Sequence, residues 1–186
     1  MSRLPTTILR AATVLCAVSM LFLWAPQQTH GRDPERPSDS LTVVDVDGST
    51  TRLLLEDLHQ MPQNTEKECI CVGEVVGFIG IFDYKGVCIT DLLEKVKAAS
   101  TTSLYKKKNL YIVFKGTDGY QVIASWVELN QTAGGARVMI ATEKDGEPLP
   151  ATEGKFRLVF PADKYVGRSV KCLERIEIHS APGTQR

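Results

Sequence analysis

Short apolar runs bounded by turn residues dominate this chain, and they are typical of strands. Residues 173–178 are the clearest example, since Ile176 and Ile178 alternate there with charged residues. Other runs of this kind predict strands over residues 42–46, 51–55, 65–72, 110–115, 119–124, 137–142 and 156–160.

Tight turns are predicted between several of these strands. Asp47-Gly48 and Asp145-Gly146 supply the positive φ that a hairpin turn requires. Pro148, just beyond the second turn, holds the residue before it extended. Repeated glycines between Gly73 and Gly86 predict a loop in that segment.

Three short helices are predicted between the strands. The first covers residues 55–60, and the second begins at Thr90, which can cap an apolar stripe. Ser125 followed by Glu128 is a capping box and predicts a third helix, to about residue 133. Strands outnumber helices, and the helices do not alternate regularly with them. The predicted fold class is therefore α+β, rich in β structure, with mixed and mostly antiparallel sheets.

The first 31 residues have the pattern of a secretory signal peptide. Arg3 and Arg10 are followed by an apolar run over residues 11–24, and Gly31 fits the position before a cleavage site. A lipoprotein signal through Cys16 is the weaker interpretation. An uncleaved anchor is a further alternative, although 14 apolar residues are fewer than the roughly 20 that cross a bilayer.

Signal cleavage would leave a chain of one-domain size, because removing 31 of the 186 residues leaves 155. Residues 32–40 contain no large apolar side chain and are predicted to be a disordered leader. The domain is predicted over residues 41–179, with a flexible tail over 180–186. This organisation predicts a periplasmic or secreted protein.

The mature chain is close to electrically neutral. The 22 basic residues include Arg3 and Arg10, so the mature chain keeps 20 against 22 acidic residues, a net charge of −2. This balance gives no indication of nucleic-acid binding, and we expect no stable membrane association after signal cleavage. The basic run Lys106-Lys107-Lys108 is interpreted as a solvated loop rather than an interaction patch.

Four cysteines remain after signal cleavage, and in an oxidising compartment four cysteines often form disulfides. Three connectivities are possible among Cys69, Cys71, Cys88 and Cys172. Cys69 and Cys71 would point to the same face of a strand, at the outer limit of disulfide geometry. A zinc site is poorly supported, because a Cys-x-Cys pair lacks the usual spacer and no second pair follows.

Several motifs occur in a fixed order along the mature chain. They are Gly86-Val87 with Asp91-Leu92-Leu93, Thr117-Asp118-Gly119-Tyr120, Asp145-Gly146-Glu147-Pro148-Leu149-Pro150, Phe156-Arg157-Leu158-Val159-Phe160-Pro161 and Val170-Lys171. Together they resemble the molybdopterin-binding domain of the sulfite oxidase family. The resemblance spans residues 45–178 and implies a small, secreted, stand-alone version of that domain.

The resemblance gives Cys71 a specific role. In the family, a strand ends in a cysteine whose thiolate binds molybdenum, and Cys71 with Gly73 two residues later is the counterpart here. A soft thiolate suits such a metal, and the glycine lets the backbone turn away under the cofactor. The alternative is that Cys71 is a buried or bridged cysteine. Glu74 stands where the family has asparagine or glycine, and the arginines that should follow are absent.

The second half of the chain keeps more of the family pattern. Arg168 and Lys171 match positions near the phosphate of the family's cofactor, and Arg157 is a less specific match. A structural or solvated role is the alternative for each. Cys88 and Cys172 stand where the family has proline and tryptophan, so the resemblance implies a disulfide between them.

Two functions follow from the resemblance. The first is a molybdopterin-dependent oxidoreductase that transfers an oxygen atom or reduces its substrate by two electrons at a molybdenum bound to Cys71. It would need a redox partner, whose identity is unknown, because the chain has no haem-attachment motif. The second is a cofactor-free binding or interaction module that keeps the fold. The missing arginines favour the second function.

Overall fold

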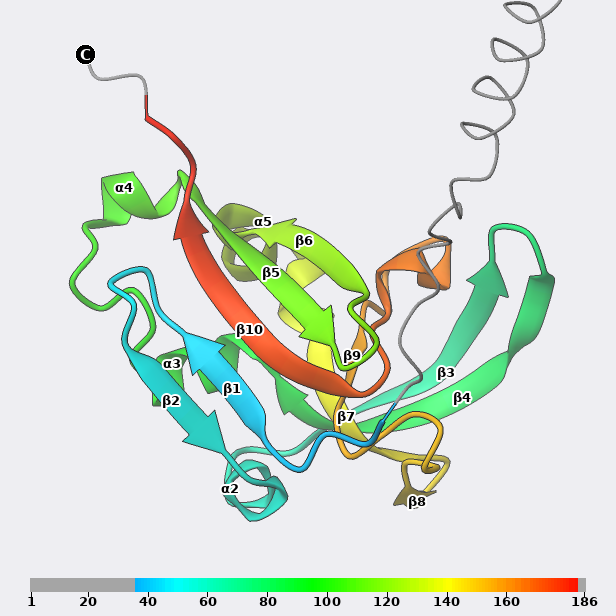
Figure 1. Cartoon of the computed structure of the whole chain (residues 1–186). Coiled ribbons are helices and arrows are strands. Elements are labelled where there is room, and N and C mark those ends of the chain that lie inside the picture. Colours follow the sequence, from blue (N-terminus) through cyan, green and yellow to red (C-terminus); the bar gives the residue numbers. More distant parts are fainter. Residues whose placement is uncertain (1–35, 184–186) are drawn as a thin grey trace, which may run out of the picture. The chain divides into compact units, whose positions relative to one another are not determined.

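The computed structural model describes residues 36–183, which form two five-stranded sheets joined by short helices (Figure 1). The first sheet contains β1 (Leu41–Val44), β2 (Thr50–Leu53), β5 (Leu110–Gly116), β6 (Gln121–Ser125) and β10 (Leu173–Ser180). The second contains β3 (Asn64–Gly73), β4 (Gly77–Cys88), β7 (Met139–Lys144), β8 (Glu147–Pro148) and β9 (Arg157–Val159). The predicted signal peptide, residues 1–31, lies outside the described residues.

The first sheet has the order β2-β1-β10-β5-β6, and its pairs are antiparallel except for the parallel pair β1–β10. In the second sheet the order is β3-β4-β7-β8, with β9 also paired to β7, and all these pairs are antiparallel. The helices are α2 (Leu55–His59), α3 (Ile89–Lys95), α4 (Leu104–Lys107), α5 (Trp126–Gln131) and the 3₁₀ turns η2 (Gly135–Arg137) and η3 (Val166–Arg168). The predicted α+β class with mixed, mostly antiparallel sheets is confirmed.

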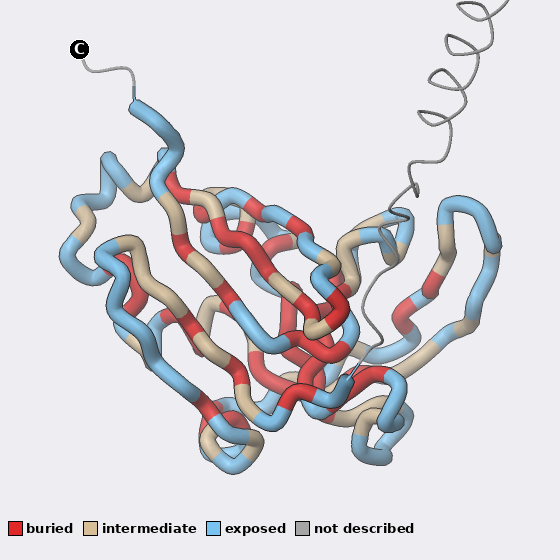
Figure 2. Tube along the Cα trace, in the orientation of Figure 1, coloured by how far each residue is buried: buried red, intermediate tan, exposed pale blue. Residues whose placement is uncertain are grey.

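Two hydrophobic cores stabilise the domain. The larger joins both sheets with α3 and α5, and it buries side chains such as Phe114, Ile140 and Leu92 completely. The smaller lies within the second sheet, around Cys71 and Tyr84. Figure 2 shows that buried positions follow β5, β7 and β10, whereas the outer half of the β3–β4 hairpin is exposed.

The prediction of a loop between Gly73 and Gly86 is wrong, because most of this segment is β4. Gly77 has a φ of +73° and makes the turn that joins β3 to β4. Gly86 lies inside the strand, where an added Cβ would come within 2.0 Å of the carbonyl oxygen of Ile140 on β7. The glycine thus permits close strand packing rather than a loop.

Two further local predictions differ from the structure. The N-cap of α3 is Cys88, which makes no side-chain cap hydrogen bond, and Thr90 lies inside the helix. The basic run is not a simple loop, because Lys106 and Lys107 belong to α4. Ser103 caps this helix by accepting a hydrogen bond from the amide of Lys106. Ser125 is the N-cap of α5 as predicted, and its hydroxyl accepts from the amide of Glu128 at 3.0 Å, while the Glu128 carboxylate accepts from Arg168.

The described part of the predicted disordered leader contacts the domain. Ser38 is buried, and its hydroxyl donates to the carbonyl of Leu173 at 2.7 Å. Asp39 forms an ion pair with Lys155 at 2.9 Å. Polar contacts hold this segment against the domain. The pattern of apolar residues in the sequence does not indicate such contacts. Among residues 36–183, no helix has the length and apolar character needed to cross a membrane.

Candidate functional site

Cys71 lies near the end of β3, opposite Gly80 on β4. Cys69 and Cys71 are both buried, whereas Ile70 between them is 63% exposed, so the two thiols are on the same face of the strand as predicted. Burial, together with the nearby carboxylate of Glu66, raises the pKa of Cys69 to about 11. Cys69 is therefore a neutral thiol near pH 7.

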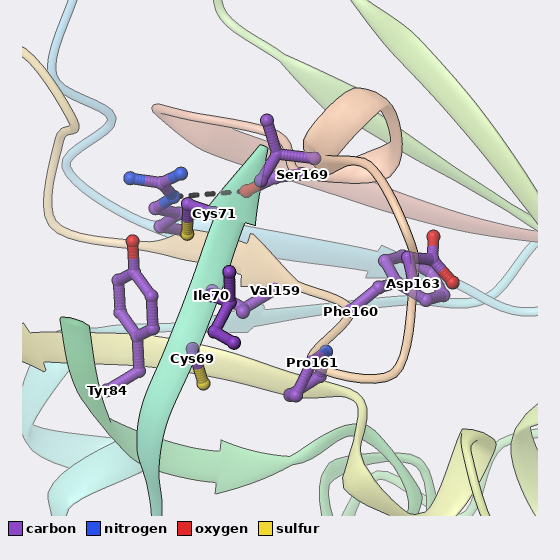
Figure 3. Close-up of a pocket in the computed structure, with 11 residues that line it drawn as sticks. Cys69, Ile70, Cys71, Tyr84, Val159, Phe160, Pro161, Asp163 and Ser169 are labelled. Carbon is purple, nitrogen blue, oxygen red and sulfur yellow. Dashed lines mark hydrogen bonds between the residues drawn. The ribbon is translucent and has the colours of Figure 1, made fainter. Parts of the chain in front are cut away.

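A small cavity adjoins the two thiols (Figure 3). Its volume is about 20 Å³, which is close to the space that one buried water needs. Tyr84 from β4, Arg157 from β9 and Ser169 after η3 line it together with the cysteines. Strands far apart in the sequence thus place a thiol, a phenol, a guanidinium and a hydroxyl around one small space.

Tyr84 lines this cavity and is completely buried. Its side chain is 0% exposed, and its hydroxyl has no hydrogen-bond partner among the described residues. Burial raises the pKa of Tyr84 well above its usual range, so the phenol keeps its proton. The guanidinium of Arg157 lies 5.2 Å from the ring centroid, a cation–π contact.

Arg157 is held by an internal network. It forms an ion pair with Glu153, and its Nε donates to Ser169 Oγ at 3.0 Å. Glu153 also accepts from Lys144 Nζ at 3.0 Å. Burial alone would raise the pKa of Glu153, but its bonds to Arg157 and Lys144 hold that pKa below its usual value. The charge of Arg157 is therefore balanced within the domain.

Arg168 is balanced in the same way. Its Nε and Nη2 each donate to Asp163 at 2.7 Å, and its Nη1 donates to Glu128 at 2.7 Å. The hydrogen bonds to Asp163 have the largest effect on the pKa of Arg168, and they raise it. The guanidinium also lies 4.1 Å from the ring centroid of Phe160. Two carboxylates thus occupy the donors that would bind a phosphate.

The other predicted cofactor residues lie away from the cavity. Gly73 pairs with Gly77 at the hairpin turn, and an added Cβ would meet the side chain of Val76 at 2.5 Å. Lys171 is exposed and does not line the cavity. Of the four residues that the resemblance assigned to the cofactor, only Cys71 borders this space. Tyr84 and Ser169 were not predicted to be site residues. Their position at the cavity depends on how β4 and η3 fold, which the sequence pattern does not show.

The disulfide that the resemblance implied between Cys88 and Cys172 is not formed in this structure, since Cys88 has a free thiol. Cys88 ends β4 and pairs with Met139 on β7. Cys172 has a positive φ and packs against Gly154 at the start of β10. The two cysteines therefore have separate sets of neighbours.

Comparison with known proteins identifies the family. Residues 30–185 match the family described as oxidoreductase molybdopterin binding domain. The chain therefore belongs to this family, whose name implies a molybdopterin cofactor. No curated protein shows significant sequence similarity to the chain.

A solved structure supports the same fold. The sulfane dehydrogenase SoxCD from Paracoccus pantotrophus matches with a TM-score of 0.59 and 21% sequence identity. The match covers 75% of this chain and 38% of that chain. The chain thus corresponds to less than half of the SoxCD chain that it matches, and the likeness shows the fold alone.

The residues around Cys71 do not fit a molybdopterin group as they are arranged. A cavity of about 20 Å³ has room for a water molecule but not for a pterin ring system. Arg157 and Arg168 donate to carboxylates of the domain itself, and Lys171 does not line the cavity. The thiol of Cys71 is the one feature of this site that matches the chemistry of the cofactor.

Proposed function

We propose that this protein is a cofactor-free member of its family, which keeps the fold as a binding module outside the cytoplasm. The observation that carries the proposal is the closure of the site, where internal carboxylates neutralise both arginines near a cavity the size of one water. A cofactor phosphate would have to displace those carboxylates. Binding a phosphate to Arg157 would separate this guanidinium from the buried carboxylate of Glu153, at a cost on the order of several kcal/mol.

The exposed half of the β3–β4 hairpin supports the binding part of the proposal. Val75 at its turn is 97% exposed, and five more large apolar side chains of the hairpin are also exposed. These are Ile70, Val76, Phe78, Ile79 and Ile81. Soluble domains rarely leave so many neighbouring apolar side chains in water unless the surface has a role.

Metal analysis tests the proposal against the oxidoreductase alternative. The secreted protein is purified from a host that makes molybdopterin, with a molybdenum enzyme of the same family produced in parallel as the positive control. We expect molybdenum far below one atom per chain, and the same low content in Cys71→Ser and Cys69→Ser variants. Stoichiometric molybdenum that is lost in Cys71→Ser and kept in Cys69→Ser would overturn the proposal and establish Cys71 as the ligand.

The location outside the cytoplasm rests on the sequence of residues 1–31, with Arg3, Arg10 and the short apolar run. Intact mass of the exported protein tests it. We expect a chain that starts near Arg32 in the soluble fraction. A mass that corresponds to all 186 residues would contradict signal cleavage.

A further inference from the structure

The helix α4 presents two large apolar side chains to solvent. Leu104 is 84% exposed and Tyr105 is 79% exposed. The three residues that follow are Lys106, Lys107 and Lys108. An aliphatic residue, a tyrosine and a cluster of lysines at one exposed tip combine the features of segments that bind at a membrane surface.

The tip is anchored on both sides to the rest of the domain. Before α4, the amide of Ala99 donates to both carboxylate oxygens of Asp45, each at 2.9 Å. After α4, the amide of Ala181 donates to the carbonyl of Asn109 at 2.8 Å. Hydrogen bonds on both sides of α4 therefore anchor the turn that carries the apolar side chains. Figure 1 shows α4 at the edge of the domain.

The lysines of this tip are not neutralised by the domain. None of Lys106, Lys107 and Lys108 forms an ion pair with a carboxylate of the described residues, and the same is true of nearby Lys97. Lys107 Nζ lies 5.0 Å from the ring centroid of Trp126. This arrangement contrasts with that of Arg157 and Arg168, which pair with carboxylates.

A groove beside α4 gives these charges a place to meet an anionic group. Its volume is about 430 Å³, and Lys97, Lys107, Ser100 and Trp126 are among the residues that line it. The carboxylate in the groove is that of Glu94 on α3. Two cations and a hydroxyl thus outweigh one exposed carboxylate, which favours a phosphate-sized anion.

We propose that α4 and this groove bind the surface of an anionic phospholipid membrane, with lipid phosphates at Lys97 and Lys107 and with Leu104 and Tyr105 in the interfacial layer. The exposed leucine favours lipid over a nucleic acid or a soluble phosphate, because neither of those would bury it. The binding is peripheral and reversible. This inference goes beyond the proposed function and does not depend on whether the domain holds a cofactor.

Vesicle co-sedimentation of the purified secreted protein tests the inference. We expect binding to vesicles of equal parts phosphatidylglycerol and phosphatidylcholine, and little binding to pure phosphatidylcholine. Because each lysine near such a surface contributes a factor of about five, the variant K106Q/K107Q/K108Q should bind roughly a hundredfold more weakly. Raising the salt from 0.1 to 1 M should weaken wild-type binding as well, since it shortens the Debye length.

Matched variants separate this tip from the other exposed apolar surface. L104S/Y105S should lose most vesicle binding, whereas V75S/F78S on the β3–β4 hairpin should bind as wild type does. Near-ultraviolet circular dichroism confirms that each variant is folded. Absence of binding to the anionic vesicles, or equal binding by the lysine variant, would overturn the inference. Tight binding of a single-stranded oligonucleotide or of inorganic phosphate without vesicle binding would also overturn it.

Discussion

Arg157 and Glu153 form an ion pair whose side chains are only 10% and 9% exposed. Arg157 lies on β9, and Glu153 lies in the loop that leads into this strand, four residues earlier. Arg157 lines the cavity at Cys71, and Glu153 fixes this guanidinium, which the family resemblance placed near a cofactor. Buried partners of this kind are costly to separate, so the pair is a structural component of the domain.

Glu153→Gln should destabilise the domain strongly, because it leaves a guanidinium buried without its carboxylate. We expect the free energy of unfolding to fall by about 3–5 kcal/mol, measured by urea denaturation. Glu147→Gln, which removes an exposed carboxylate on β8, is the control and should change stability by less than about 0.5 kcal/mol. Similar effects of the two substitutions would contradict the assignment of Glu153 to this network.

Tyr84→Phe should not destabilise the domain, because it removes a buried hydroxyl that has no hydrogen-bond partner among the described residues. We expect the free energy of unfolding to change by less than about 1 kcal/mol, because no hydrogen bond to an oxygen or nitrogen of the described residues is lost. Thermal unfolding followed by circular dichroism measures the change. A loss of more than about 1 kcal/mol would mean that the hydroxyl does form a hydrogen bond in solution.

The sequence predicted the strands of the first sheet, most clearly β1 and β6, whose residues alternate between a buried and a more exposed face. It also located the cap at Ser125 and the common face of Cys69 and Cys71. These features depend on residues that are close together in the chain, and local rules of periodicity and capping describe them.

The features that sequence reasoning missed depend on contacts between distant segments. Gly86 was assigned to a loop because its need for close packing against Ile140 on β7 is visible only once the two strands are paired. The partners of Arg168 are five and forty residues away, on the loop before η3 and on α5. A family pattern could align Arg168 with a cofactor phosphate, but it could not show that two carboxylates already bind the guanidinium.

Acid should destabilise the domain through Glu177 on β10. Burial alone would raise its pKa, but Lys115, Arg175 and His179 lower it from 4.5 to about 2. Because the pKa of the folded state is the lower one, this contribution to stability is complete above about pH 4.5 and is lost as the pH falls toward 2.

Denaturation curves between pH 6 and pH 2 should therefore show a smaller acid-dependent loss in Glu177→Gln than in wild type. We expect the difference to be about 1–2 kcal/mol. Glu174→Gln, at an exposed position on the same strand, should leave the pH dependence unchanged. Parallel curves for wild type and Glu177→Gln would show that Glu177 does not carry this dependence.

Gly86→Ala should disrupt the pairing of β4 with β7, which supports the small core around Cys71. The new Cβ would lie 2.0 Å from the carbonyl oxygen of Ile140 and 2.8 Å from the Cα of Ala141. Both obstacles are backbone atoms, so the strands themselves must separate. We expect a loss of about 3 kcal/mol or more in the free energy of unfolding, measured by urea denaturation.

Gly80→Ala on the same strand is the matched comparison. Its Cβ would lie 2.5 Å from the ring of Phe82, which can rotate away because it is the end of a partly buried side chain. The loss should therefore be smaller than for Gly86→Ala by at least about 1 kcal/mol, and Gly183→Ala, with nothing within 4 Å, should be neutral. Equal losses at positions 80 and 86 would mean that β4 and β7 are not packed as closely as the structure places them.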